Sequence, residues 1–165
     1  MPVLAALDFE VVVVDERDEL LTEERFPGVR RVLEDPRLFL ASVDHQPEDF
    51  VLVVTHDHAL DQDLVEHLLA VDLAWLGMIG SQGKVARFLV RFRAAGVPVD
   101  TLRRLSAPVG LDIGAETPAE IAVSIAAEVV RVRRRSQGPT QPLSEQPLEA
   151  RGGDGKAVAP RMSQD

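Results

Sequence analysis

Two histidines and an aspartate follow directly after an apolar run of the chain. The run covers residues 50–54, and Thr55, His56, Asp57 and His58 come next. Imidazole and carboxylate groups bind metals, transfer protons or hydrogen-bond polar ligands. Histidines two positions apart in a loop bind a metal poorly without a third ligand, although Asp61 is near in sequence. We favour contact with a polar ligand, and a structural hydrogen-bonded turn and a metal site stay open as alternatives.

A glycine-containing stretch is a second candidate site. It runs through Gly77, Gly80 and Ser81, and Lys84 follows about one turn later. Glycine lets the backbone approach a ligand, and the free N–H groups of a helix that begins at Ser81 would favour an anion. Lys84 could add positive charge there. The same residues also make a good helix start without any ligand.

Two further stretches carry acids. Asp15 comes at the end of an apolar run. Dinucleotide-binding sheets place an acid at this position that binds a ribose hydroxyl, but an acid in a solvated turn explains Asp15 equally well. Residues 107–116 hold Asp112, Gly114 and Glu116. The two acids could act as acid–base groups or bind a polar substrate. An ordered turn, in which they cap nearby backbone, is slightly favoured on spacing alone.

Continuous β-branched runs predict the elements that would position these residues. The runs at 10–15, 50–55 and 73–80 are apolar without alternation, which is typical of parallel strands buried on both faces, and residues 30–33 predict a weaker strand. In open parallel sheets, ligands bind beyond the carboxyl ends of the strands. We therefore expect all the candidate residues at one edge of the sheet.

Helical periodicity separates the runs. One apolar stripe includes Leu64 and Leu68, and a second runs from Val85 to Phe92, with Gly96 after its end. The third helix has the clearest start, because Thr117, Pro118 and Glu120 form a capping box with proline at the first position. Alternation of strands and helices predicts right-handed βαβ units in an α/β fold.

Composition limits the classes of function. The chain has no cysteine, which excludes disulfides and a cysteine nucleophile, and its net charge of −9 argues against binding nucleic acid or anionic membranes. We read the basic run 131–135 as the end of a helix. No signal peptide or membrane span is indicated, so we expect a cytoplasmic protein. Residues 136–165 contain several prolines and glycines among scattered polar and charged residues and show no periodicity, so we expect a disordered tail behind a domain of residues 1–135.

Taken together, these stretches resemble the C-terminal Rossmann domain of the XdhC/CoxI family, the xanthine dehydrogenase accessory proteins. The resemblance covers roughly residues 3–134 and is carried by residues 12–15, 24–27, 54–61, 76–81 and 107–118. It implies a Rossmann-like three-layer parallel sheet.

The resemblance also implies a function. A member of the family would be a chaperone that binds the molybdenum cofactor (molybdopterin), holds it during sulfuration and passes it to a molybdenum hydroxylase apoenzyme, with a cysteine desulfurase as second partner. The implied ligand-binding residues are Asp15, Thr55, His56, Asp57, His58, Gly77, Gly80, Ser81, Lys84, Asp112 and Gly114.

The chain departs from the family pattern at its start. The family opens with a strand and a glycine-rich phosphate loop, whereas residues 2–7 resemble only the end of the following helix. The absent strand is the central one of the sheet, so its absence would leave a gap. Either the true start lies upstream, or the chain is a degenerate or split gene product, or the sheet re-pairs, and a homodimer that completes the sheet also stays open. Gln82 and Gly83 stand where the family has basic residues. An NAD(P)-dependent oxidoreductase, with a nucleotide as ligand, and a non-binding remnant or interaction module are the alternative functions.

Overall fold

The computed structural model describes residues 2–135 and contains five short strands in two parallel sheets. Strands β1 (Val12–Asp15) and β2 (Arg30–Leu33) form one sheet. Strands β3 (Phe50–Val53), β4 (Trp75–Met78) and β5 (Leu105–Ser106) form the other, in the order β3-β4-β5. The predicted parallel α/β fold is confirmed, including the weaker strand at residues 30–33. The expected tail at 136–165 lies outside the described residues.

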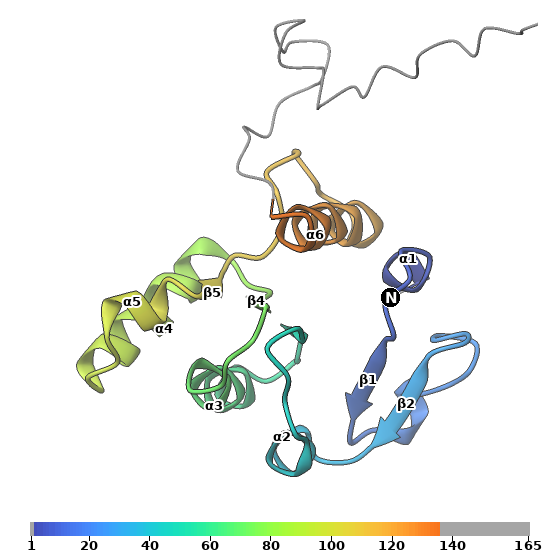
Figure 1. Ribbon diagram of the computed structural model, residues 1–165, viewed down its shortest axis with the longest axis horizontal. Coiled ribbons are helices and arrows are strands. Elements are labelled where there is room, and N and C mark those ends of the chain that lie inside the picture. Colours follow the sequence, from blue (N-terminus) through green and yellow to red (C-terminus); the bar gives the residue numbers. More distant parts are fainter. Residues whose placement is uncertain (1, 136–165) are drawn as a thin grey trace, which may run out of the picture.

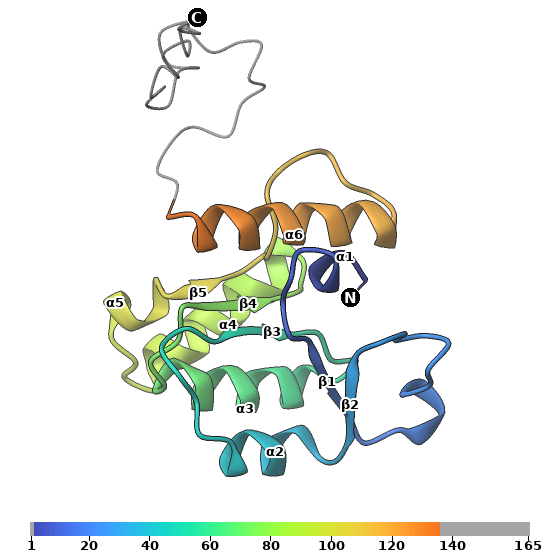
Figure 2. The ribbon, with the colours of Figure 1, turned by 45° about the vertical axis from the view of Figure 1, so that its right-hand side comes forward.

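Helices lie on both faces of these strands. Figure 2 shows α6 and α1 on one side of the sheets, and α2 and α3 on the other. The described helices, with the 3-10 turn η1, are α1 (Pro2–Ala5), η1 (Asp18–Leu20), α2 (Pro36–Ser42), α3 (His58–Leu69), α4 (Gln82–Ala94), α5 (Val99–Leu102) and α6 (Pro118–Arg133). This arrangement has the three layers that were expected. None of these helices is long and apolar enough to cross a membrane.

The helix boundaries follow local chemistry. Thr117 and Glu120 form the predicted capping box, with Pro118 at the first position of α6. Ser81 caps α4, because its hydroxyl accepts a hydrogen bond from the Lys84 backbone N–H at 3.3 Å. The predicted glycine after α4, Gly96, has φ +85°, in the left-handed region where glycine carries no steric penalty.

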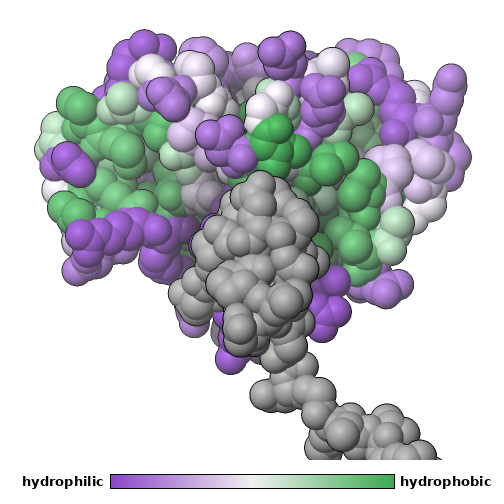
Figure 3. Space-filling view, turned by 90° about the horizontal axis from the view of Figure 1, so that it is seen from above, coloured by the Kyte–Doolittle hydropathy of each residue, from purple (hydrophilic) through white to green (hydrophobic). Residues whose placement is uncertain are grey.

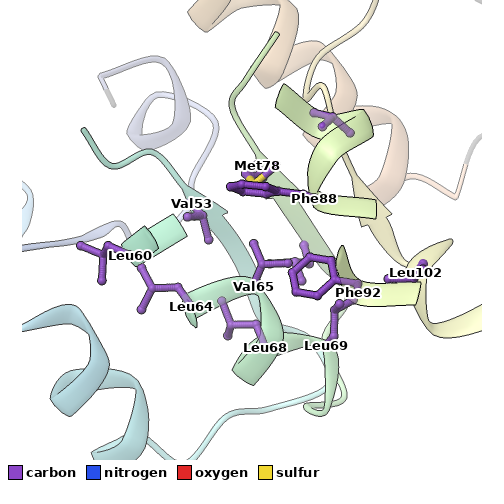
Figure 4. Packing of buried hydrophobic residues seen from close by; sticks show 12 residues of the cluster. Val53, Leu60, Leu64, Val65, Leu68, Leu69, Met78, Phe88, Phe92 and Leu102 are labelled. Atoms are coloured by element: carbon purple, nitrogen blue, oxygen red, sulfur yellow. The ribbon is translucent and has the colours of Figure 1, made fainter. Parts of the chain in front are cut away.

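The core is divided between the two faces of β3 and β4. The larger cluster joins α3 and α4 to these strands, and Figure 4 shows Val65 and Leu68 of α3 beside Phe88 and Phe92 of α4. The smaller cluster joins Trp75 to Ile125 and Val129 of α6. Side chains that alternate along β3 explain the division, since Val51 and Val53 pack in the larger cluster and Phe50 and Leu52 against the smaller one.

No strand of the described chain joins the two sheets, so β1 and β3 each have an unpaired edge (Figure 1). A cavity of ≈1290 Å³ lies between them and is lined by every residue of both strands. We call this cavity the strand slot. The β1 run was expected to be buried on both faces, but Val12 is 37% exposed and its neighbours are only half-buried. The gap at the centre of the sheet was expected, and it explains this exposure.

Apolar residues also reach the surface elsewhere. Figure 3, seen from above the view of Figure 1, shows apolar side chains in two areas of that face, with hydrophilic side chains around them. The exposed large apolar residues come from several elements and include Leu38 of α2, Val90 of α4 and Val123 of α6. Scattered exposure of this kind is ordinary for a folded domain and needs no ligand to explain it.

Candidate functional site

The loops that follow β3, β4 and β5 lie at one edge of the sheet, because the three strands are parallel and in register. Val53 is paired with Met78, and Gly77 with Ser106. The β3–α3 loop holds Thr55, His56 and Asp57. The β4–α4 loop holds Gly80 and Ser81, and the segment after β5 holds Asp112 and Gly114. The predicted convergence of these segments at the carboxyl edge is therefore seen in the fold.

A buried ion pair connects the first two loops. Lys84 Nζ lies 2.5 Å from Asp61 Oδ2, and the two residues are 8% and 0% exposed. The other carboxylate oxygen, Asp61 Oδ1, accepts hydrogen bonds from the Thr55 hydroxyl at 2.7 Å and from the Thr55 backbone N–H at 3.2 Å. A buried charge needs this kind of full pairing. Asp61 thus fixes the start of the β3–α3 loop against α4.

This pair changes the roles expected for both residues. Asp61 was considered as a third ligand for His56 and His58, but its carboxylate is directed to Lys84 and Thr55. Lys84 was expected to add charge for an anion at the α4 N-terminus, but its ammonium group is taken up by Asp61 and is closed off from solvent. Both residues therefore position the loops. The N–H groups at the start of α4 are left to attract an anion without help from Lys84.

The segment after β5 is held by a residue of α6 that sequence reasoning did not assign to the site. The Glu128 carboxylate accepts hydrogen bonds from Trp75 Nε1 at 3.2 Å, from the Gly110 backbone N–H at 2.5 Å and from the Ser106 hydroxyl. Close by, the buried Ser124 hydroxyl donates to the Leu111 carbonyl at 2.5 Å. Ser124 and Glu128 are four positions apart and therefore lie on one face of α6, and this polar face binds the segment after β5.

Glycine is required at two points where the backbone passes close to other groups. Gly110 has φ +108°, and a Cβ there would collide with the Ser124 side chain. A Cβ at Gly77 would collide with the Trp75 ring and with Val109. Gly77 therefore serves packing beneath the loops, and it is buried in β4. By contrast, the space around Gly114 is open, although its φ is +70°.

The side chains of His56, Asp57 and His58 are exposed at the edge. Asp57 caps α3, because its Oδ1 accepts hydrogen bonds from the N–H groups of Ala59 at 2.6 Å and Leu60 at 3.4 Å. These bonds, first the one from Ala59, lower the pKa of Asp57 below its usual value. The turn interpretation thus accounts for Asp57, whereas the two imidazoles are not used by the turn and face outward.

Asp15 lies across the strand slot from these loops. Arg17 binds both of its oxygens, with Nε 2.8 Å from Oδ1 and Nη2 2.8 Å from Oδ2. The hydrogen bonds from this guanidinium lower the pKa of Asp15, and the charge of His56 contributes in the same direction. Asp15 and Thr55 both line the slot at its carboxyl end. Asp15 and Thr55 therefore face the same cavity from opposite strands.

The remaining predicted residues lie on the same edge at its surface. Gly80 is half-buried under the Lys84 side chain, and Ser81, Asp112 and Gly114 are at least partly exposed. Within residues 2–135, no group of three His, Asp or Glu side chains has a geometry that could hold a metal ion. The arrangement combines outward imidazoles, a helix N-terminus and carboxylates. Such a set can hydrogen-bond a polar heterocycle and bind an anion.

Comparison with known proteins assigns the family. The XdhC Rossmann domain model matches residues 1–129, which is most of the chain. The chain belongs to the XdhC Rossmann domain family. The resemblance found from the residues at 12–15, 54–61, 76–81 and 107–118 is thereby confirmed.

Relatives and a solved structure agree with this assignment. The chain is 37% identical over 155 residues to the uncharacterized protein YqeB of Escherichia coli K12, covering 90% of this chain and 28% of that protein. It is 33% identical over 128 residues to a probable xanthine dehydrogenase subunit of Bacillus subtilis 168, covering 77% and 37%. A crystal structure described as a xanthine dehydrogenase from Bacillus halodurans superposes with a TM-score of 0.69 at 32% identity, covering 86% and 41%. The XdhC domain thus spans less than half of each of these proteins.

Proposed function

We propose that this XdhC domain binds the molybdenum cofactor at the carboxyl edge of its sheet and acts in the maturation of xanthine dehydrogenase. Family membership and the names of two relatives support a role connected with that enzyme. The observation that carries the proposal is the edge itself. The Asp61–Lys84 pair and Glu128 bring three loops together, and His56 and His58 are left exposed there.

The donor set fits the chemistry of such a ligand. Molybdopterin carries a phosphate and a pterin ring with hydrogen-bond donors and acceptors. The free N–H groups at the start of α4, capped by Ser81, favour an anionic group. The imidazoles of His56 and His58 can donate or accept, and the Asp112 carboxylate can accept from ring N–H groups. These residues are all at the surface of the same edge, where a ligand can reach them.

Each group has a distinct part in this proposal. His56 and His58 contact the ligand directly, and Asp112 orients it by accepting hydrogen bonds. Thr55, Asp61 and Lys84 hold the β3–α3 and β4–α4 loops in place, and Glu128 does the same for the segment after β5. The cofactor, when bound, would supply the redox chemistry of the target enzyme. The domain supplies binding and protection, so its role is that of a chaperone, and not that of a catalyst.

The partners follow from this role. A carrier of the cofactor must transfer it to the apoenzyme of a molybdenum hydroxylase, and a cysteine desulfurase must provide the sulfur that is installed beforehand. Both partners are proposed from the family resemblance. Because the chain matches less than half of each relative, the whole-protein activities of those relatives are proposals here as well.

Oxidative pterin fluorescence of the purified protein after incubation with molybdenum cofactor tests the proposal. We expect wild type to retain pterin, and His56→Ala and Asp112→Ala each to reduce the retained amount while the fold stays intact. His67→Ala and Asp100→Ala are matched controls, because His67 is exposed at the far end of α3 and Asp100 is exposed in α5. Equal retention by all four variants, or none by a cooperatively folding wild type, would overturn the proposal.

The same preparation separates the alternatives. If the domain is an NAD(P)-dependent oxidoreductase, adding it to NADH or NADPH should change the fluorescence of the nucleotide. If Asp15 binds the ribose, the molybdenum cofactor should compete with this binding. A non-binding interaction module should retain neither ligand and still bind the apoenzyme in a pull-down. Retention of pterin with no response to NADH or NADPH is the result that we expect.

A further inference from the structure

The segment that leads from β5 into α6 is tied to α6 where it leaves the sheet (Figure 2). The Gly110 N–H donates a hydrogen bond to the Glu128 carboxylate at 2.5 Å. Leu111 exchanges two hydrogen bonds with Ser124, because its N–H donates to the Ser124 carbonyl at 3.2 Å and its own carbonyl accepts from the Ser124 hydroxyl at 2.5 Å. These bonds fix the first end of the segment.

The second end of the segment is tied to the same helix. The N–H groups of Glu116 and Thr117 both donate to Glu120 Oε2, at 2.9 Å and 2.8 Å. Glu120 lies four positions before the serine and eight before the glutamate that hold the first end, so all three side chains are on one face of α6. Residues 112–115 bridge two fixed points, which limits the conformations that they can adopt.

Ile113 lies in the middle of this bridge, and its side chain is 51% exposed. Within residues 2–135, the other exposed large apolar side chains lie in helices or strands, except Val54, which borders the strand slot. The neighbours of Ile113, Asp112 and Gly114, are exposed as well. An apolar side chain on a loop that is already fixed loses little conformational freedom when it makes a contact, which favours binding.

The segment leaves the sheet beside the two other loops of the carboxyl edge. The Val109 N–H donates to the Met78 carbonyl at 3.1 Å, and the Ile79 N–H donates to the Val53 carbonyl at 3.1 Å. The three chains therefore turn away from the sheet at neighbouring positions, on strands about 4.8 Å apart. The loop that carries Ile113 is thus next to the start of α4, whose free N–H groups favour an anion.

We propose that Ile113 packs against the flat face of the pterin ring, while Asp112 accepts hydrogen bonds from N–H groups at the edge of the ring. This inference rests on the proposed cofactor site and adds the orientation of the ligand in it. The carboxylates of Asp112 and Glu116 disfavour a phosphate near Ile113, so the anionic end lies toward the start of α4 and the ring toward Ile113. Sites for small ligands combine apolar contact surface with a few polar groups that fix the orientation.

Methyl NMR of the full 165-residue chain, labelled at isoleucine and valine methyl groups, measures this contact directly. Hydroxymethylpterin, which has no phosphate, is the probe for the ring, and inorganic phosphate is the probe for the anion. We expect the pterin to move the Ile113 methyl resonances upfield, because protons over the face of an aromatic ring are shielded, and phosphate to leave them in place. The methyl groups of Val123 on α6, which is 52% exposed, are the matched control and should not move.

Retention of the intact molybdenum cofactor tests the same contact by affinity. Ile113→Ala should weaken retention about tenfold, because most of an aliphatic contact is lost, and Ile113→Leu should restore most of it. Val123→Ala should retain as much as wild type. The Trp75 emission of Ile113→Ala should stay at the wild-type wavelength, since Glu128 still holds Trp75 and Gly110. An unchanged emission shows that the segment keeps its position.

The possible results distinguish this inference from the proposed function. Ile113 methyl groups that do not respond to the pterin, or equal retention by wild type and Ile113→Ala, would overturn the ring contact and leave the cofactor site standing. A pterin response without retention of the cofactor by wild type would support the ring contact and overturn the proposed function. If Ile113→Ala retains the cofactor but no longer binds the apoenzyme in a pull-down, Ile113 belongs to a protein interface and the inference is wrong.

Discussion

Lys84 Nζ and Asp61 Oδ2 lie 2.5 Å apart beneath the carboxyl edge, and the Thr55 hydroxyl and N–H complete the shell of the carboxylate. The pair joins α3 to α4 and thereby fixes the relative position of two of the loops that we assign to the site. Neither charged group is available to a ligand. The ion pair thus positions the residues around it at the carboxyl edge. The exposed imidazoles of His56 and His58 belong to the β3–α3 loop, which this pair holds in place.

Breaking this pair from one side should be costly. Lys84→Met leaves the Asp61 carboxylate buried without its cation, and we expect a loss of about 3–5 kcal/mol in the free energy of unfolding. The double variant Asp61→Asn, Lys84→Met removes both charges and keeps an acceptor for Thr55, so it should recover much of that loss. Urea denaturation measures both. Losses that simply add in the double variant would show that the two residues are not coupled.

Removal of the Glu128 carboxylate should loosen the segment after β5. Glu128→Ala leaves the Trp75 indole N–H and the Gly110 N–H without their acceptor, at a cost of about 1–3 kcal/mol for each buried group. Trp75 is the only tryptophan of the chain, so its emission should move to longer wavelength as water enters. Glu128→Gln keeps one acceptor oxygen and should show a smaller shift. Glu66→Ala, at an exposed position on α3, should leave the emission unchanged.

Acid should destabilise the domain in part through Asp57. The folded-state pKa of Asp57 lies below its unfolded value of 3.8, so the unfolded chain binds more protons between the two values. The contribution is fully present above pH 3.8 and is lost as pH falls through the folded pKa. Asp57→Asn keeps a capping oxygen and should nearly match wild type at about pH 7, yet its stability should fall less steeply in acid. Denaturation midpoints measured from about pH 7 down to about pH 2 test this, and parallel curves would contradict it.

A side chain at Gly110 should cost more than one at Gly114. Both have positive φ, which costs about 1–2 kcal/mol for a residue with a Cβ. At Gly110 the added methyl group also meets the Ser124 side chain, whereas at Gly114 it meets nothing within 4 Å. Gly110→Ala should therefore lower the thermal midpoint further than Gly114→Ala. Ser124→Gly removes the atoms that the methyl group meets but also loses the hydrogen bond to Leu111, so the double variant should lose less than the sum of the two single losses. Equal losses in Gly110→Ala and Gly114→Ala would argue against the steric effect.

Local patterns were sufficient for most of the fold. The runs at 10–15, 50–55 and 73–80 became β1, β3 and β4, and the capping box at Thr117 began α6 where expected. Helix α2 was not predicted, although Asp35 and Pro36 give it a capping residue and a proline at its first position. Strand β5 has only two residues, which is too short for a periodic signal.

Long-range pairing accounts for what the sequence did not reveal. Asp61 and Lys84 are 23 positions apart, and Glu128 is 53 positions from Trp75. Periodicity identifies the polar face of a helix, but it does not show which loop will cover that face. His45 is a similar case, because its side chain is only 9% exposed and its Nε2 is buried without a hydrogen-bond partner among the described residues. His45 lines the slot, which no local pattern indicates.

The division of the domain at the strand slot has a consequence for how it unfolds. Almost all fully buried apolar residues belong to the part built on β3–β4–β5, and only Leu21 and Val29 represent the β1–β2 part. Segments with few buried apolar contacts open at a lower free energy than the core. The β1–β2 part should therefore melt first, as a separate cooperative unit, in a two-step calorimetric transition.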